Sequence, residues 1–232
     1  MNFKNVLLVY VLFSSPFVMA QNEKISFGFE VTPAITDWRA QTNENYPFPG
    51  ISFASQVNGK FGGSIGVYSA YGISEKIEIS LGVNYYLNGV KTNKIDIFIP
   101  PFLEDDPAIP DVVWNAYNIH FVTIPLRVKY NFLPSFYIRG GGDFAYIVDY
   151  RVVSYQQFPD ERKRTSQSIE NVDYNKININ ANLGIGYQFK ISDRILGYVE
   201  PSFNMSFMRL VKDVPLSEYP YYVGLTIGSQ LK

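Results

Sequence analysis

Residues 177–190 read ININANLGIGYQFK, with an apolar side chain at every odd position and a polar residue or glycine at every even one. Residues 77–88, IEISLGVNYYLN, repeat this alternation with a single tyrosine among the even positions. A period of two points successive side chains to opposite faces of a β-sheet. Both stretches therefore predict β-strands that have one apolar and one polar face.

Weaker alternation of the same kind covers most of the chain after residue 21. It predicts six further strands, at 24–37, 62–73, 118–132, 136–152, 195–209 and 221–232. The eight strands have about 12 to 17 residues each, compared with about 5 or 6 in an average strand and about 9 to 11 in a strand that crosses a bilayer. They are long enough to cross a membrane and protrude from it.

The predicted connections alternate in length. Tight turns at 74–76, 133–135 and 192–194 alternate with long connections at 38–60, 91–117 and 153–175 and a shorter one at 211–220. Outer-membrane barrels have an even number of strands, short periplasmic turns and long outer loops. The sequence thus predicts an all-β fold, an eight-stranded antiparallel up-and-down transmembrane β-barrel with both termini in the periplasm.

The composition of the two faces indicates which one contacts lipid. A soluble barrel of the lipocalin type turns its polar face to water, where Lys and Glu would be expected, but the polar face here is mostly Gly, Ser, Asn and Thr. Small residues suit the crowded interior of an eight-stranded barrel. Aromatic residues recur near the strand ends of the apolar face, as in interfacial girdles: Tyr85, Tyr130, Phe132, Tyr187, Phe189, Phe207 and Tyr221. We therefore expect contact with outer-membrane lipid.

The overall composition excludes several kinds of site. The net charge of -1 gives no electrostatic reason to expect nucleic acid as a partner. The absence of cysteine excludes disulfides, thiolate metal ligands and a cysteine nucleophile. With one histidine, and with acidic residues that are not spaced as in a calcium loop, we expect no metal and no cofactor.

The first twenty residues have the layout of a secretory signal. Lys4 supplies positive charge, residues 6–18 are an apolar run, and Val18, Met19 and Ala20 precede the expected cleavage point. The run is about 13 residues, shorter than the about 20 that a spanning helix needs. We expect a signal peptide at 1–20, one barrel domain at 21–232, and export to the bacterial outer membrane.

Seven charged residues fall on the predicted polar face: Glu30, Glu78, Arg127, Lys129, Arg139, Asp143 and Glu200. Because an unpaired buried charge is costly, we expect charges of both signs in a lumen to pair with one another. We interpret them as a structural polar network that plugs the lumen. An ion path is the alternative, since charges inside a membrane often mark one.

Two other features bear on function. His120, the only histidine, falls at the outer end of a predicted strand, where an imidazole could act as a general base, but the sequence assigns it no serine or aspartate partner. The predicted loops carry an acidic stretch at 104–106 and a basic stretch at 162–164. These stretches could clasp each other, contact a partner or face water.

Residues 121–132, FVTIPLRVKYNF, contain Ile-Pro-Leu followed after two residues by Lys-Tyr. A proline inside a strand is otherwise a poor fit, because it cannot donate a hydrogen bond to the ladder. This stretch, together with YIRGGGD at 137–143 and LGIGY at 183–187, resembles the eight-stranded outer-membrane barrel family that includes PorT, a component of type IX secretion and gliding systems. The resemblance covers residues 21–232. The final residues, GSQLK, depart from the aromatic end that is common in such barrels, so either the last strand is recognised differently or a terminal residue is missing.

These observations predict a non-enzymatic, integral outer-membrane β-barrel. As the resemblance implies, it would be a structural or partner-binding component of an envelope or secretion assembly, and a protein partner would bind the outer loops 38–60, 91–117 and 153–175. Two alternatives remain open at this point. One is a narrow pore or small-solute transporter, and the other is an outer-membrane enzyme that uses His120.

Overall fold

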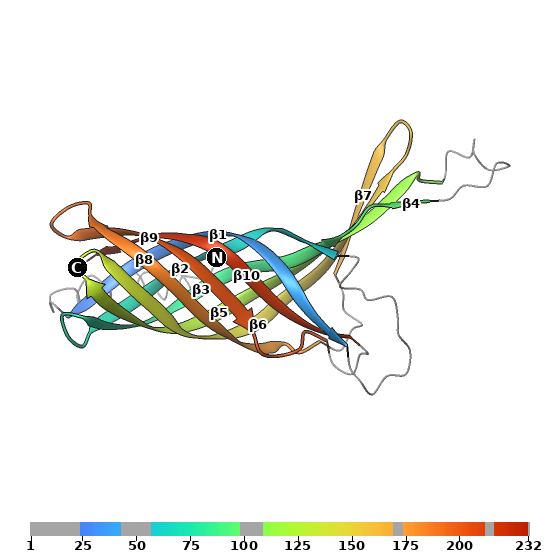
Figure 1. Ribbon diagram of the computed structural model, residues 1–232. Coiled ribbons are helices and arrows are strands. Elements are labelled where there is room, and N and C mark those ends of the chain that lie inside the picture. The colour runs from blue at the N-terminus through green and yellow to red at the C-terminus, as the bar shows by residue number, and fades with distance from the viewer. Residues whose placement is uncertain (1–23, 43–56, 98–108, 169–173, 212–215, 232) are drawn as a thin grey trace, which may run out of the picture.

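The computed structural model describes residues 24–42, 57–97, 109–168, 174–211 and 216–231 (Figure 1). Their strands are β1 (Ile25–Thr42), β2 (Val57–Gly72), β3 (Ile77–Thr92), β4 (Ile95–Asp96), β5 (Val112–Leu133), β6 (Phe136–Gln157), β7 (Arg162–Ser168), β8 (Ile177–Lys190), β9 (Ile195–Ser206) and β10 (Leu216–Leu231). No helix within these ranges is long and apolar enough to cross a membrane. The expected signal peptide, 1–20, lies outside the described residues.

Eight of these strands close into a barrel. Strands β1, β2, β3, β5, β6, β8, β9 and β10 each pair antiparallel with the next, and β10 pairs with β1. The connections at one end are short, with only Pro134 and Ser135 between β5 and β6. We call this the periplasmic end, because short turns face the periplasm in barrels of this kind. The eight-stranded, antiparallel, up-and-down barrel predicted from the alternation is confirmed.

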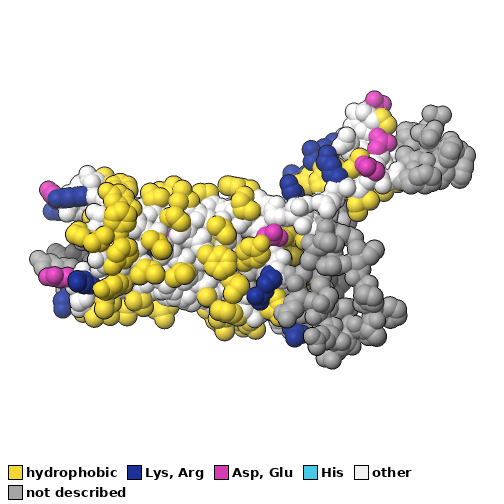
Figure 2. Space-filling view, in the orientation of Figure 1, with side chains coloured by type: hydrophobic (Ala, Val, Ile, Leu, Met, Phe, Trp, Pro, Cys, Tyr) yellow, Lys and Arg dark blue, Asp and Glu magenta, His cyan; other side chains and the backbone are white. Residues whose placement is uncertain are grey.

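Exposed apolar side chains point outward from all eight barrel strands and form a belt, one face of which is shown in Figure 2. On β5, Val122, Ile124 and Leu126 are 39–55% exposed, whereas the intervening Thr123 is buried. Aromatic rings gather on this outer face near the periplasmic end, where successive ring contacts link four residues: Phe132, Phe136, Tyr187 and Phe189. The barrel thus presents to its surroundings the apolar surface, edged by aromatic rings, that a bilayer requires.

Two predicted outer loops, 91–117 and 153–175, instead contain regular strands, which corrects the sequence-based boundaries. β5 and β6 continue into these predicted loops as 112–117 and 153–157, and β4 and β7 pair with their outer parts. β1 and β2 likewise extend into 38–60. These extensions were missed because strands that have left the lipid lose the apolar–polar alternation while they keep their pairing. The acidic stretch 104–106 lies outside the described residues.

The projecting sheet is called the arm below and comprises residues 94–96, 112–117, 151–157 and 162–168. Figure 1 shows it leaning away from the barrel axis at the end opposite the short turns.

Tyrosines lie across glycines near the periplasmic end of the lumen. Tyr68, Tyr137 and Tyr198 stand directly opposite glycines on neighbouring strands, which are Gly28, Gly186 and Gly228 respectively. A Cβ placed on Gly186 would lie 2.1 Å from the Tyr137 ring, so the ring occupies the space that a side chain would need. The three tyrosines and Ala70 form a buried apolar layer.

We expect Gly186→Ala to destabilise the barrel by about 1–3 kcal/mol, because overpacking forces side chains off their rotamers and shifts the backbone. The urea midpoint for loss of heat-modifiable gel mobility measures the effect. The matched control is Gly142→Ala, where the new Cβ would meet only the Asn180 carbonyl oxygen at 3.6 Å. This control should change stability by less than about 0.5 kcal/mol. Equal effects of the two substitutions would contradict the tyrosine–glycine packing.

Candidate functional site

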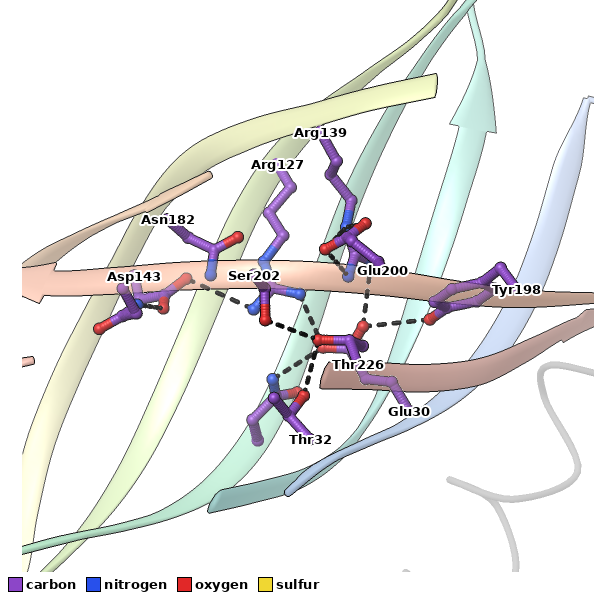
Figure 3. Close-up of polar contacts among 12 residues, drawn as sticks. Glu30, Thr32, Arg127, Arg139, Asp143, Asn182, Tyr198, Glu200, Ser202 and Thr226 are labelled. Carbon is purple, nitrogen blue, oxygen red and sulfur yellow. Dashed lines mark hydrogen bonds and ion pairs between the residues drawn. The ribbon is translucent and has the colours of Figure 1, made fainter. Parts of the chain in front are cut away.

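A layer of paired charges crosses the lumen (Figure 3). Glu30 lies 2.7 Å from Nη1 of Arg127 and 3.0 Å from Nη1 of Arg139. Arg139 also pairs with Glu200 at 2.8 Å, and Arg127 lies 3.8 Å from Asp143. All five side chains are buried. Because they come from β1, β5, β6 and β9, this ion layer connects walls of the barrel that are distant in sequence.

Neutral hydrogen-bonding groups surround the ion layer. Asn84 Nδ2 and the Tyr198 hydroxyl donate to Glu30 at 3.0 and 3.1 Å, and Asn204 Nδ2 donates to Asp143 at 2.7 Å. The Thr226 hydroxyl, also shown in Figure 3, contacts the hydroxyls of two further strands, those of Thr32 and Ser202. Hydrogen bonds that reach a buried charge from several directions lower the cost of its burial.

The two remaining charges of the predicted lumen set lie apart from the ion layer. Glu78 accepts a hydrogen bond from Gln230 Nε2 at 2.7 Å, and the Lys129 ammonium lies 4.7 Å from the centre of the Tyr137 ring. Both residues line a pocket at the periplasmic end, together with Lys24. The structure thus brings five of the seven residues together and places the other two at the periplasmic mouth.

An apolar cluster fills the lumen on the outer side of the ion layer. Tyr86 stacks on Phe121 with ring centroids 5.5 Å apart and contacts Tyr222 at 5.0 Å. Trp38 donates from Nε1 to the Asn88 side chain at 2.9 Å. The other buried members are Ala34, Val90, Ile119, Ala145, Ile147, Tyr150 and Leu210. The ion layer is therefore enclosed between this cluster and the tyrosine layer on the periplasmic side.

His120 lies on the outer face of the barrel, where its Nδ1 shares a hydrogen bond with the Tyr85 hydroxyl. Asp149 stands opposite it on β6, pairs with Arg151 at 2.5 Å and accepts a hydrogen bond from the Ser168 hydroxyl at 3.2 Å. A catalytic serine triad places the imidazole between the serine and the carboxylate. Here the serine donates to the carboxylate directly. In the described part of the chain, no three His, Asp or Glu side chains could hold a metal ion.

The arm carries a stack of aromatic rings and cations. Trp114 and Tyr155 lie parallel, with centroids 5.1 Å apart and an interplanar angle of 8°. The Arg162 guanidinium lies 4.5 Å from the centre of the Trp114 ring and 4.9 Å from that of Tyr155. Lys94 lies over Trp114 at 5.0 Å and Arg164 over Tyr155 at 5.9 Å. The sequence analysis identified the basic stretch 162–164 but not the two rings, because Trp114 and Tyr155 lay in predicted loops and were not assigned to a strand.

The sequence matches the outer membrane protein beta-barrel domain family over residues 19–211. The chain belongs to this family. It is therefore an integral β-barrel of the bacterial outer membrane, and its apolar belt contacts lipid.

Solved outer-membrane proteins show a general likeness to this barrel. Neisserial surface protein A is 8% identical over 90% of this chain and 96% of its own, with a TM-score of 0.41. Ail, the attachment invasion locus protein of Yersinia pestis, is 8% identical over 88% and 99%, with a TM-score of 0.38. The outer membrane protease OmpT of Escherichia coli is 8% identical over 90% and 93%, with a TM-score of 0.43. No curated protein matches the sequence.

Proposed function

We propose that this outer-membrane barrel is a non-enzymatic, non-conducting component of an envelope or secretion assembly and that it contacts a protein partner through its arm. The observation that carries the proposal is a contrast between the two parts of the molecule. Side chains fill the lumen on both sides of the ion layer, whereas β5 and β6 continue beyond the barrel and add two further strands. The resemblance to the PorT family supports a secretion assembly as the setting.

The face of the arm that continues the lumen side is suited to a protein partner. Tyr117 fixes this side of the sheet, because it contacts Trp38 in the lumen. The residues of the face are those at every second position of β5 from Tyr117, together with the residues that pair with them on the neighbouring strands. This inner face consists of Ile95, Val113, Asn115, Ser154, Gln156, Lys163, Thr165 and Gln167. Its one charged residue, Lys163, pairs with Glu161 at 2.8 Å. This face shares its low content of free charge with the cores of protein interfaces.

We expect the purified barrel to be electrically silent in planar bilayers, because two packed layers close the lumen. A known porin, reconstituted in the same way, serves as the positive control. Reproducible conductance steps from preparations with full heat-modifiable mobility would contradict the proposal and favour the narrow pore.

A photoreactive amino acid at Gln156 tests the partner contact in living cells. The expected result is a discrete protein adduct that disappears when Ser154 is replaced by arginine. The matched control carries the same photoreactive residue at Ser192, in the turn between β8 and β9 at the opposite end of the barrel. Absence of an adduct from Gln156, Asn115 and Gln167 alike would overturn the proposed contact. If a well-folded His120→Ala variant reproduced the phenotype of deletion, the enzyme alternative would replace this proposal.

A further inference from the structure

The lipid-facing side of β5 continues onto the arm. Val122 belongs to the apolar belt, and every second residue beyond it, ending at Trp114, lies on the same side of the strand. The irregularity between β5 and β6 at His120 does not interrupt this pattern, because the extra residue, Val148, is on β6. Trp114 is therefore on the side of the sheet that faces lipid nearer the periplasmic end of β5.

Strand pairing extends this side across the neighbouring strands. Lys91 stands opposite Ala116, Arg151 opposite Asn118, and Tyr155 opposite Trp114. Arg164 stands opposite Tyr155, and Lys60 Nζ hydrogen-bonds the Asn118 side chain. We define the basic–aromatic face as Lys60, Lys91, Lys94, Trp114, Arg151, Tyr155, Arg162 and Arg164.

The charge of this face is strongly positive. Among the described residues it has six cations, whereas pairing places three carboxylates on the same outward side, those of Asp37, Asp96 and Asp149. Asp149 already pairs with Arg151 at 2.5 Å. The cations of the ring stack are held over Trp114 and Tyr155 and have no carboxylate partner among the ion pairs of the described residues.

The position of the face relative to the belt indicates what it meets. Arg151 follows Val148, the last exposed apolar residue of β6, by three residues, which is about 10 Å along a strand. Figure 2 shows the basic side chains of the arm on the flank turned back toward the belt, and the acidic ones nearer the free end. Because the arm leans away from the barrel axis, this flank is turned toward the membrane surface (Figure 1).

We propose that the basic–aromatic face binds phosphate-bearing headgroups of the outer leaflet and holds the arm against the membrane surface. Arginine guanidiniums form paired hydrogen bonds with phosphate oxygens, and tryptophan and tyrosine prefer the headgroup level of a membrane. A lipid surface is the occupant because the face is continuous with the belt and complementary in charge to phosphate. The proposal concerns the side of the arm opposite the inner face and does not rest on the proposed protein contact.

Trp114 provides the measurement. The chain has two tryptophans, and Trp38 is 5% exposed inside the lumen, so a Trp114→Phe variant isolates the Trp114 signal by difference. The full barrel is inserted into vesicles of phosphatidylcholine alone or of phosphatidylcholine with phosphatidic acid. We expect acrylamide quenching of Trp114 to fall at least about twofold with phosphatidic acid, because basic side chains are attracted to an anionic surface.

Arg162→Glu combined with Arg164→Glu should return the quenching to its level in phosphatidylcholine alone. The matched control is Lys163→Glu, on the same strand but on the opposite face, and it should leave the protection intact. Heat-modifiable mobility checks that each variant is folded. If the double reversal does not fold, Arg162→Gln with Arg164→Gln replaces it and should lose part of the protection.

Three outcomes would overturn the inference. One is equal quenching in the two kinds of vesicle, and another is protection that survives the double reversal. The third is protection in phosphatidylcholine vesicles on addition of free inorganic phosphate, which would assign the site to a soluble anion. If the photoreactive residue at Gln156 gave no protein adduct while phosphatidic acid still protected Trp114 from quenching, the result would count against the proposed protein contact and not against this lipid contact.

Discussion

Replacing Arg139 with methionine is expected to lower the free energy of unfolding by about 3–5 kcal/mol, the usual cost of removing one partner of a buried ion pair. Glu200 is fully buried, and among the ion pairs of the described residues it takes part only in the one with Arg139. Glu30 would lose one of its two guanidiniums and keep the other, from Arg127. The variant would thus hold three buried carboxylates, those of Glu30, Asp143 and Glu200, around a single arginine, Arg127.

A second substitution distinguishes the loss of pairing from the loss of packing. Adding Glu200→Gln to Arg139→Met removes the orphaned charge, so the double variant should be more stable than Arg139→Met alone. Urea titrations followed by heat-modifiable mobility would measure both. The surface control is Glu161→Ala, which breaks the exposed pair with Lys163 and should cost about 0–1 kcal/mol. A double variant that is no more stable than the single one would mean that Arg139 acts through its bulk.

The alternation of the sequence was enough to predict the barrel because one side of each strand meets lipid and the other meets the lumen. That contrast ends where the strands leave the membrane. Trp114 and Tyr155 therefore fell in predicted loops, although they pair directly across β5 and β6. Trp38 was missed for the same reason, since it lies on the part of β1 that extends into the predicted loop 38–60.

The partners within the lumen could not be read from the sequence. Strand parity places Glu30 and Arg139 on the same face, but which charges meet depends on how strongly the strands are staggered around the barrel. The inward tyrosines posed a similar difficulty. Tyr137 and Gly186 are opposite each other only once the register of β6 and β8 is known. Alternation assigns a face to each residue, and the register assigns its neighbours.

Leu183→Arg should destabilise the barrel in a bilayer by about 2–4 kcal/mol, because a charge near the middle of the lipid-facing belt must be removed from water. Leu183 is 53% exposed and lies midway along the outward face of β8, between Ile177 at the outer end and Phe189 at the periplasmic end. Ile177→Arg is the depth control, since arginine near the headgroups costs only about 0–1 kcal/mol. Gln167→Arg, on an exposed position of the arm, should be nearly neutral.

The order of these three costs, measured by reversible unfolding from phosphatidylcholine vesicles, tests where the bilayer lies along the strands. The same order sets the level at which the basic–aromatic face begins, because Arg151 lies three residues beyond Val148, the last exposed apolar residue of the belt on β6. If Ile177→Arg were as costly as Leu183→Arg, the bilayer would extend farther along the strands. The base of the arm would then be immersed in lipid, and its cations could not lie at the level of the phosphates.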